Sequence, residues 1–228
     1  MTDIADRYAE FYRGREPVHV YPVEFVVRAF LGSYPRLPRD IGEREGRRVL
    51  DIGFGDGRNM PLLANLGMEI YGTEISQEIC DRTSARLERL GIRIDARVGK
   101  NHQLPFDDAF FDEVLACHSC YYIEPGTNFN DNAAEMGRVL KPRGRCVLSV
   151  PMSSSYILRG AGDLGEGHMQ ITNDPYGVRN GYVLKAFGSA EDIERTLSPW
   201  FVDFRVGACR SDWWGIEEHV WIVVCNRL

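Results

Sequence analysis

Between residues 47 and 151 the chain alternates short β-rich runs with helical stretches, and this alternation limits the possible folds more than any other feature. The runs predicted as strands are 47–53, 68–75, 92–99, 111–122 and 145–151. Strands that alternate with helices are typical of a mostly parallel sheet with helices packed on both faces. The expected class is therefore α/β, with a doubly wound sheet.

The helices between these strands are indicated by capping and stop residues. A short helix fits before Gly67, and Ser76 can cap the next helix, which Gly91 ends. Residues 131–140 predict another helix, stopped sharply by the Lys-Pro-Arg-Gly sequence that follows it. Each connection is thus long enough to cover one face of the sheet.

The remaining segments complete a single domain, as 228 residues allow. Residues 1–45 predict a helical cap whose aromatic side chains pack over an edge of the sheet, followed by a cofactor-binding half over 46–151. Residues 151–182 contain six glycines and no clear period, so 152–188 is interpreted as an insertion that closes over an acceptor site. In residues 189–228 we expect a helix from Ser189 and then two antiparallel strands, 201–210 and 217–228. The sheet then has seven strands.

Composition excludes several classes of protein. No apolar run approaches the roughly 20 residues of a membrane span, and the N-terminus lacks the profile of a signal peptide, so we expect a cytoplasmic protein without a membrane partner. The net charge of −6 argues against a nucleic-acid partner, although a local basic patch stays open. The six cysteines are scattered, as is typical of reduced thiols, and only 117–120 has metal-ligand spacing. A zinc site needs a second pair, so no metal is expected. A homodimer is left open.

The stretch 49–59, VLDIGFGDGRN, joins a strand to a helix through three glycines, as in nucleotide-binding βα units. A dinucleotide turn needs a third glycine where this chain has Arg58. A pyrophosphate would also lie near Asp51 and Asp56, and like charges 4 Å apart cost about 4 kcal/mol at an effective dielectric of 20. The turn therefore favours a ligand that carries positive charge.

A further carboxylate, outside the glycine turn, indicates the chemistry of the other end of this ligand. Glu74 ends the second predicted strand, 21 residues after Gly53, where an acidic side chain meets ribose hydroxyls. A nucleoside with a cationic end fits both features, and S-adenosylmethionine is the common metabolite of this kind.

At these residues the chain resembles the class I S-adenosylmethionine-dependent methyltransferases, over about residues 47–151. Residues 51–57 resemble the first motif of that family, Glu74 its ribose-binding acid, and 104–107 with 111–112 the stretch around its fourth strand. The resemblance implies that Gly53 and Gly55 pass under the methionine part of the cofactor and that Asp51 helps to hold its amino group. The family commonly has an acidic residue where this chain has Lys100, so we assign adenine recognition to Asn101. The full set of expected cofactor residues is Asp51, Gly53, Phe54, Gly55, Gly57, Asn59, Glu74, Ile75, Asn101, His102, Gln103, Cys117 and His118.

The expected reaction is transfer of a methyl group to an oxygen or nitrogen of a small metabolite or sugar. Two histidines are candidate general bases: His118, which follows the fourth strand, and His168, in the glycine-rich insertion. Each also has a structural interpretation, as a packing residue or an exposed loop residue. The expected acceptor-binding residues are Tyr12, His19, Tyr21, Tyr122, Tyr156, His168, Tyr176 and Arg179.

Two further motifs have competing interpretations. Residues 173–176, Asn-Asp-Pro-Tyr, are similar to the Asn-Pro-Pro-Tyr motif of methyltransferases that act on nucleic-acid bases, but they follow the wrong strand and predict a turn. Trp213 and Trp214 would stack on a planar acceptor, or pack within a hairpin against the sheet.

Three alternative functions stay open: an RNA or protein methyltransferase, a nicotinamide-dependent oxidoreductase, and a cofactor-binding protein without catalysis. A broad basic trough around the site would favour RNA. A closed pocket roofed by residues 151–182 would favour a metabolite, and this pocket is the expectation.

Overall fold

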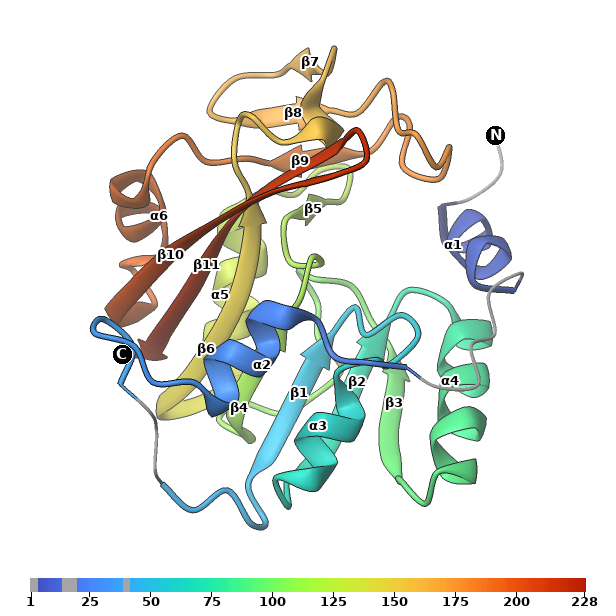
Figure 1. The fold of residues 1–228 in the computed structure, drawn as a ribbon, viewed down its shortest axis with the longest axis vertical. Coiled ribbons are helices and arrows are strands. Elements are labelled where there is room, and N and C mark those ends of the chain that lie inside the picture. Colours follow the sequence, from blue (N-terminus) through green and yellow to red (C-terminus); the bar gives the residue numbers. More distant parts are fainter. Residues whose placement is uncertain (1–3, 14–19, 39–41) are drawn as a thin grey trace.

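A computed structural model describes residues 4–13, 20–38 and 42–228. Its main sheet has seven strands in the order β10-β11-β6-β4-β1-β2-β3 (Figure 1). These strands are β1 Arg48–Ile52, β2 Glu69–Glu74, β3 Ile94–Val98, β4 Phe111–Ala116, β6 Leu140–Pro151, β10 Phe201–Trp213 and β11 Ile216–Arg227. All neighbours are parallel except β11, which runs antiparallel to both β6 and β10. The predicted seven-stranded, mostly parallel sheet is confirmed.

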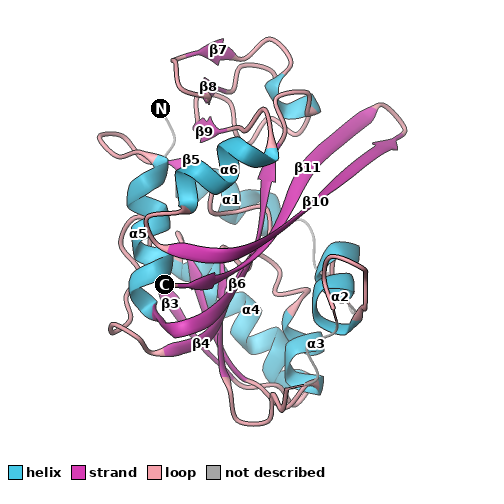
Figure 2. Cartoon of the chain, turned by 90° about the vertical axis from the view of Figure 1, so that its left-hand side faces the viewer, coloured by secondary structure: helices cyan, strands magenta, loops and turns pink. Residues whose placement is uncertain are grey.

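Helices cover both faces of this sheet (Figure 2), because its central strands are apolar on both sides. The helices are α1 Ile4–Arg13, α2 Glu24–Leu31, α3 Met60–Asn65, α4 Gln77–Arg89, α5 Phe129–Val139 and α6 Ala190–Leu197. Neighbouring residues of β1 show the alternation: Val49 packs with the core cluster of α2, α3 and α4, and Leu50 packs with that of α5 and α6. The two cores meet across the sheet.

The position of the N-terminal segment corrects one expectation. Phe30 of α2 belongs to the same buried cluster as Val49, Leu115 and Val147, which lie on the three central strands β1, β4 and β6. The helix therefore covers a face of the sheet, and the prediction that it covers an edge was wrong. The other N-terminal helix, α1, contacts α4.

Several boundaries differ from those expected. β4 ends at Ala116, and the chain turns at His118, whose φ of 56° is in the left-handed region. The Lys-Pro-Arg-Gly segment after α5 belongs to β6, which begins at Leu140 instead of 145. α5 itself starts at Phe129, because Asn128 and Asp131 form a capping box. The capping geometry, which the periodicity does not reveal, therefore decides where α5 begins.

The glycine-rich insertion is structured, so its interpretation as a segment without regular elements was wrong. It supplies three strands, β7 Gly162–Asp163, β8 His168–Gln170 and β9 Val183–Lys185, which form a sheet with β5 Tyr122–Ile123. A short 3₁₀ helix, η1 Tyr156–Leu158, precedes them. Strands of two or three residues are too short to show a hydrophobic period. This second sheet lies beyond the carboxyl ends of the parallel strands (Figure 1).

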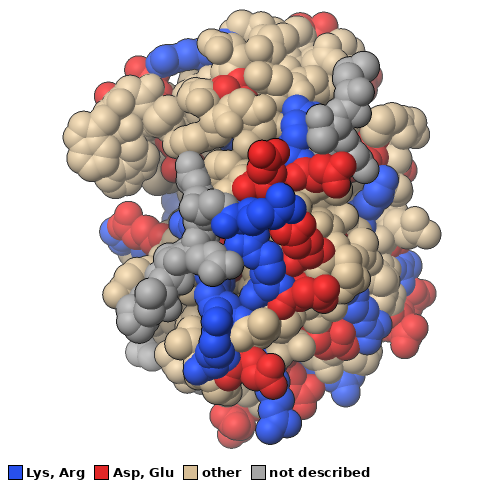
Figure 3. All heavy atoms as spheres, turned by 90° about the vertical axis from the view of Figure 1, so that its right-hand side faces the viewer, with Lys and Arg blue, Asp and Glu red and all other residues tan. Residues whose placement is uncertain are grey.

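The surface formed by α1 and α4 carries both signs of charge. Figure 3 shows acidic and basic side chains lying side by side on this face. Glu78, for example, pairs with Arg13 at 2.7 Å and lies 3.8 Å from Arg82. No helix among the described residues has both the length and the apolar character that crossing a bilayer requires.

Candidate active site

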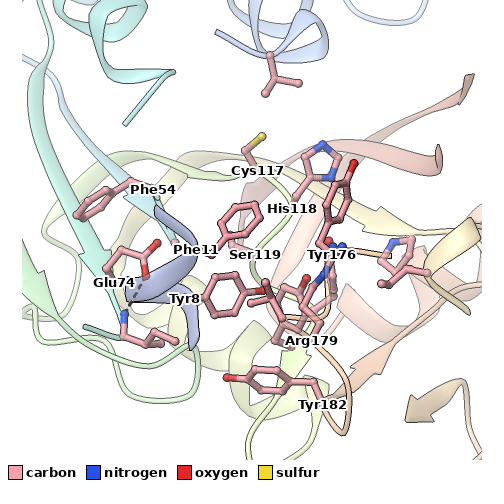
Figure 4. Close-up of a pocket in the computed structure, with 18 of the residues that line it drawn as sticks. Tyr8, Phe11, Phe54, Glu74, Cys117, His118, Ser119, Tyr176, Arg179 and Tyr182 are labelled. Carbon is pink, nitrogen blue, oxygen red and sulfur yellow. Dashed lines mark hydrogen bonds between the residues drawn. The ribbon is translucent and has the colours of Figure 1, made fainter. Parts of the chain in front are cut away.

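A cavity of about 330 Å³ opens at the carboxyl ends of β1, β2 and β4. Open α/β sheets bind ligands at this edge. The glycine turn and β2 form one end of the cavity, while α1, η1 and the turn before β9 contribute to the rest. Figure 4 shows Phe54 and Glu74 at one end and His118, Tyr176 and Arg179 at the other, with Tyr8 and Phe11 of α1 between them.

The structure brings most of the expected site residues into this cavity. From the expected cofactor set, the lining residues are Gly53, Phe54, Asn59, Glu74, Ile75, Asn101, Cys117 and His118. From the expected acceptor set they are Tyr12, Tyr122, Tyr156, Tyr176 and Arg179.

Other expected residues lie elsewhere. Tyr21 is 78% exposed and does not line the cavity, and His168 lies on β8, outside it. His102 and Gln103 also do not line the cavity, since their segment turns back through a bridge between Lys100 and Gln103. These four placements correct the expectation of contact with a ligand. His19 lies outside the described residues.

The glycine turn needs its glycines for two reasons. Gly53 and Gly55 have φ values of 64° and 55°, which side chains rarely adopt. A Cβ at Gly53 would lie 2.5 Å from Ser119 Cβ, and one at Gly55 would lie 2.3 Å from the hydroxyl of Tyr12. Tyr12, expected as an acceptor residue, thus rests on the glycine turn and belongs to the cofactor end. Three expected cofactor residues, Asp51, Gly55 and Gly57, do not line the cavity and lie behind its wall.

Asp51 is a buried carboxylate whose two oxygens have no hydrogen-bond partner among the described residues. Burial raises the pKa of Asp51 well above its usual range, the charges of Glu74 and Asp56 raise it further, and the nearby Asn59 side chain lowers it in part. An unpaired buried acceptor is costly, so this position fits a cationic donor such as an ammonium group.

The charge of Asp56 differs from the sequence-based interpretation. Asp56 pairs with Arg58 at 2.7 Å, so only Asp51 remains an unpaired carboxylate at the turn. The sequence analysis counted Asp51 and Asp56 alike as charges that repel a phosphate, and for Asp56 the pairing with Arg58 offsets that charge. The bulk of Arg58 still fills the position where a dinucleotide turn has its third glycine.

Glu74 is held in place by backbone donors. Its Oε1 accepts the Gly55 N–H at 2.8 Å, and its Oε2 accepts the Ile75 N–H at 3.0 Å. Burial raises the pKa of Glu74, while these two bonds lower it. Each oxygen keeps a second lone pair, so the carboxylate can accept the two hydroxyls of a ribose.

Asn101 presents an acceptor to the cavity. Its Nδ2 donates to the carbonyls of Ser119 and Tyr122, at 2.9 and 3.3 Å, and no donor among the described residues contacts its Oδ1. This arrangement suits the amino group of an adenine. Lys100 instead pairs with Glu124 at 3.1 Å.

His118, Ser149 and Glu218 form a row that the sequence did not predict. The buried Ser149 Oγ accepts the backbone N–H of His118 at 2.9 Å and lies 3.3 Å from its Nδ1. The hydroxyl hydrogen has no other acceptor within reach among the described residues, so it is assigned to Nδ1. A neutral ring then carries its hydrogen on Nε2, which lies 3.8 Å from Glu218 Oε1.

The ionisation of His118 is set by its surroundings. Burial lowers its pKa, Arg179 and Arg58 lower it further, and Glu218 raises it. The net direction is downward, so the imidazole is neutral near pH 7.

Arg179 is fixed at the acceptor end of the cavity. It forms a bidentate pair with Asp174 at 2.7 and 3.1 Å and donates to the Tyr156 hydroxyl at 3.1 Å. Its guanidinium also lies 5.6 Å from the ring centre of Tyr176. Asp174, within the turn predicted at 173–176, accepts the N–H groups of Tyr176, Val178 and Arg179, so the sequence motif is structural.

Sequence reasoning missed several lining residues, chiefly Tyr8, Phe11, Asp56, Arg58, Ser119, Tyr121, Glu124, Tyr182 and Glu218. Most carry no local motif, since they come from elements far apart in the chain. A clue was available for α1, where Tyr8, Phe11 and Tyr12 lie three or four residues apart and share a helix face.

Comparison with known proteins also indicates a methyltransferase domain. The model of the methyltransferase domain matches residues 50–148. A protein-L-isoaspartate O-methyltransferase from Methylorubrum extorquens is 31% identical over 117 residues, which is 51% of this chain and 47% of that protein. The chain spans about half or less of the length of the curated relatives it matches.

Solved structures share the fold over most of the chain. A S-adenosylmethionine-dependent methyltransferase from Methanosarcina mazei has a TM-score of 0.66 and 17% identity, covering 92% of this chain and 99% of that chain. The 1,6-didemethyltoxoflavin-N1-methyltransferase of Burkholderia thailandensis, with its acceptor and S-adenosylhomocysteine bound, has a TM-score of 0.57 and 18% identity, covering 80% and 72%. The matched methyltransferase domain, the sheet order and these shared folds agree in supporting a class I S-adenosylmethionine-dependent methyltransferase.

Proposed function

We propose that this protein transfers a methyl group from S-adenosylmethionine to an oxygen or nitrogen of a small molecule. The observation that carries the proposal is the tyrosine-lined cavity that continues from the glycine turn to Arg179. Wall residues from α1, η1 and the turn before β9 surround the acceptor end, as a small ligand requires.

Four groups would hold the cofactor. Asp51 supplies the acceptor for its ammonium, Glu74 accepts the ribose hydroxyls, Asn101 Oδ1 accepts the adenine amino group, and Phe54 with Ile75 supplies apolar surface. When bound, the sulfonium supplies an activated methyl group. The protein's main task is then to position the acceptor, which contributes roughly 7–11 kcal/mol.

The acceptor's proton goes to Glu218 in this proposal. With its hydrogen on Nε2, neutral His118 has no free lone pair on the side of Glu218, so it acts as a donor beside that carboxylate. For Nε2 to accept a proton, the ring hydrogen would have to move to Nδ1. The Ser149 hydroxyl would then lose its acceptor, at a cost of about 1–3 kcal/mol. The base expected at His118 is therefore assigned to Glu218, with His118 as its neighbour. His168 lies outside the cavity and has no role in this scheme.

The alternatives fit less well. On the face in Figure 3 the described residues carry acidic and basic side chains side by side, whereas a basic trough would favour RNA. Arg58 opposes a dinucleotide, as argued from the sequence. A protein acceptor, which the name of the Methylorubrum relative suggests, would have to enter a cavity of only about 330 Å³.

Incubation with S-adenosylmethionine that carries a labelled methyl group tests the proposal. The purified chain is mixed with a cell extract that contains metabolites, RNA and protein, and the labelled products are separated by size. We expect the label in the small-molecule fraction. Label confined to the protein or RNA fraction would reject the proposed acceptor class, and E218Q serves as the inactive control.

A further inference from the structure

The β10–β11 hairpin reaches past the rest of the sheet (Figure 2). Its two strands stay paired up to Trp213 and Ile216, whereas the pairing of β11 with β6 stops at Val220 and Pro151. The tip therefore projects at the edge where the parallel strands end, next to the cavity.

The tip carries an unusual residue. Trp214 and Gly215 form a two-residue turn in which both φ values are positive, 52° and 97°. Such turns favour Asn-Gly, and a bulky residue in this conformation is strained. Trp214 is also 95% exposed, with Trp213 half exposed beside it at a ring distance of 6.2 Å. Neither folding nor solubility explains a tryptophan here.

The two tryptophans line an outer cleft of about 830 Å³. Seven of the ten residues that line this cleft also line the inner cavity, so the cleft is its continuation toward solvent. Its aromatic wall consists of Phe11, Tyr12, Tyr156, Tyr176, Trp213 and Trp214. The charged pair Asp56–Arg58 is internally neutralised, and Glu218, the proposed proton acceptor, lines both the cleft and the inner cavity.

We infer that this outer cleft is a subsite for a planar, uncharged aromatic ring system of the acceptor. The inference rests on the proposed function. The inner cavity is at the small end of the range of about 300–1,000 Å³ for ligand pockets, and the cofactor takes part of it. An acceptor of more than a few atoms must therefore extend outward, between Tyr176 and the tryptophans. Flat aromatic faces favour a flat ring.

The test uses the full chain saturated with S-adenosylhomocysteine. Coumarin, acridone and lumichrome, three planar uncharged probes, are titrated while tryptophan fluorescence and heat are recorded, and camphor serves as a saturated control of similar polarity. The test variant is Trp214→Asn, because asparagine suits the turn and keeps it folded. Leu164→Ala removes another exposed apolar side chain, 58% exposed, that lies outside both cavities.

We expect at least one planar probe to bind the wild-type chain and W214N to weaken that binding about 5- to 150-fold, the loss of one stacking partner. W214F should retain most of the affinity, and L164A should match the wild type. The affinity for S-adenosylhomocysteine should not change.

The inference is overturned if no planar probe binds, if W214N binds as well as the wild type, or if camphor shows the same dependence on Trp214. A wild-type dimer that W214N dissociates would also overturn it, since a second copy would then cover the ring. Failure of the chain to bind S-adenosylhomocysteine would instead reject the proposed function.

Discussion

Asp51 lowers the free energy of unfolding when no cation is bound. Its carboxyl is fully buried and unpaired, and its pKa is raised by burial. Because the folded state holds this proton more tightly than the unfolded state, the free energy of unfolding falls as the pH rises from about 4 through the raised pKa. A site residue that destabilises the free protein is typical of ligand-binding positions.

Asp51→Asn should therefore stabilise the cofactor-free chain by about 1–3 kcal/mol at pH 8, and by little below pH 4, because the amide cannot ionise. The same change should weaken S-adenosylhomocysteine binding about 10- to 100-fold through the lost charge-assisted bond. Urea unfolding over the pH range and calorimetry measure the two effects. A variant that is less stable at pH 8, with unchanged affinity, would show that Asp51 has another role.

Glu218 is the proposed proton acceptor. Glu218→Gln should lower kcat by about 10²- to 10⁴-fold, measured with the acceptor that the labelling experiment identifies, and should leave cofactor affinity unchanged. The neighbouring Glu217, which pairs with Arg159 outside the inner cavity, gives a matched control in Glu217→Gln. His118→Asn keeps an N–H donor and should retain more activity than E218Q. The reverse order would return the base to His118.

At the scale of elements, α1 is seated on the glycine turn through Tyr12. Gly55→Ala places a methyl group 2.3 Å from the position of the Tyr12 hydroxyl, and its φ of 55° adds backbone strain of about 1–3 kcal/mol. We expect G55A to lose more stability than Gly46→Ala, which has a similar φ and nothing within 4 Å. Adding Tyr12→Ala should recover the difference.

Thermal unfolding of the four variants in a double-mutant cycle measures this coupling. A coupling energy of about 1 kcal/mol or more would be expected for residues in contact. Additive losses would show that Tyr12 does not rest on the turn, and that α1 leaves this end of the cavity open.

The turn from Asp174 to Arg179 depends on one carboxylate. Burial raises the pKa of Asp174, but the Arg179 pair and the backbone N–H bonds from Arg179 and Tyr176 outweigh it and lower that pKa. Asp174→Ala should cost about 3–5 kcal/mol of unfolding free energy, because it leaves the buried Arg179 unpaired. The difference from wild type should persist above pH 4 and shrink as the pH falls through the lowered pKa. Asp163→Ala, which removes a similar turn bond at an exposed site, should cost far less.

At the scale of the molecule, sequence predicted the half of the site that local motifs encode. Gly53, Gly55 and Glu74 lie on consecutive elements, so their spacing alone fixes their meeting point. Asp56 was misjudged because its partner Arg58 was treated as a steric block and not as a charge. The carboxylate–histidine row was missed because His118 and Glu218 are brought together only by the antiparallel return of β11.

The insertion shows a second limit of sequence reasoning. The strands β7, β8 and β9 pair with one another over two or three residues each, which gives no period to detect. Its histidine was counted as a site residue because it lies in a segment expected to close over the site, and the structure places His168 outside the cavity. Tyr156 and Arg179 from the same stretch do reach it, since η1 and the Asp174 turn direct them inward.

The central claim is that the cavity binds a cationic nucleoside and rejects a dinucleotide. Isothermal titration of the purified chain with S-adenosylmethionine and, separately, with NADH tests this claim most directly, and Glu74→Gln is the matched variant. We predict micromolar or tighter binding of the sulfonium compound, at least tenfold weaker in E74Q, and no heat from NADH. Saturable binding of NADH, with none of S-adenosylmethionine, would contradict the account.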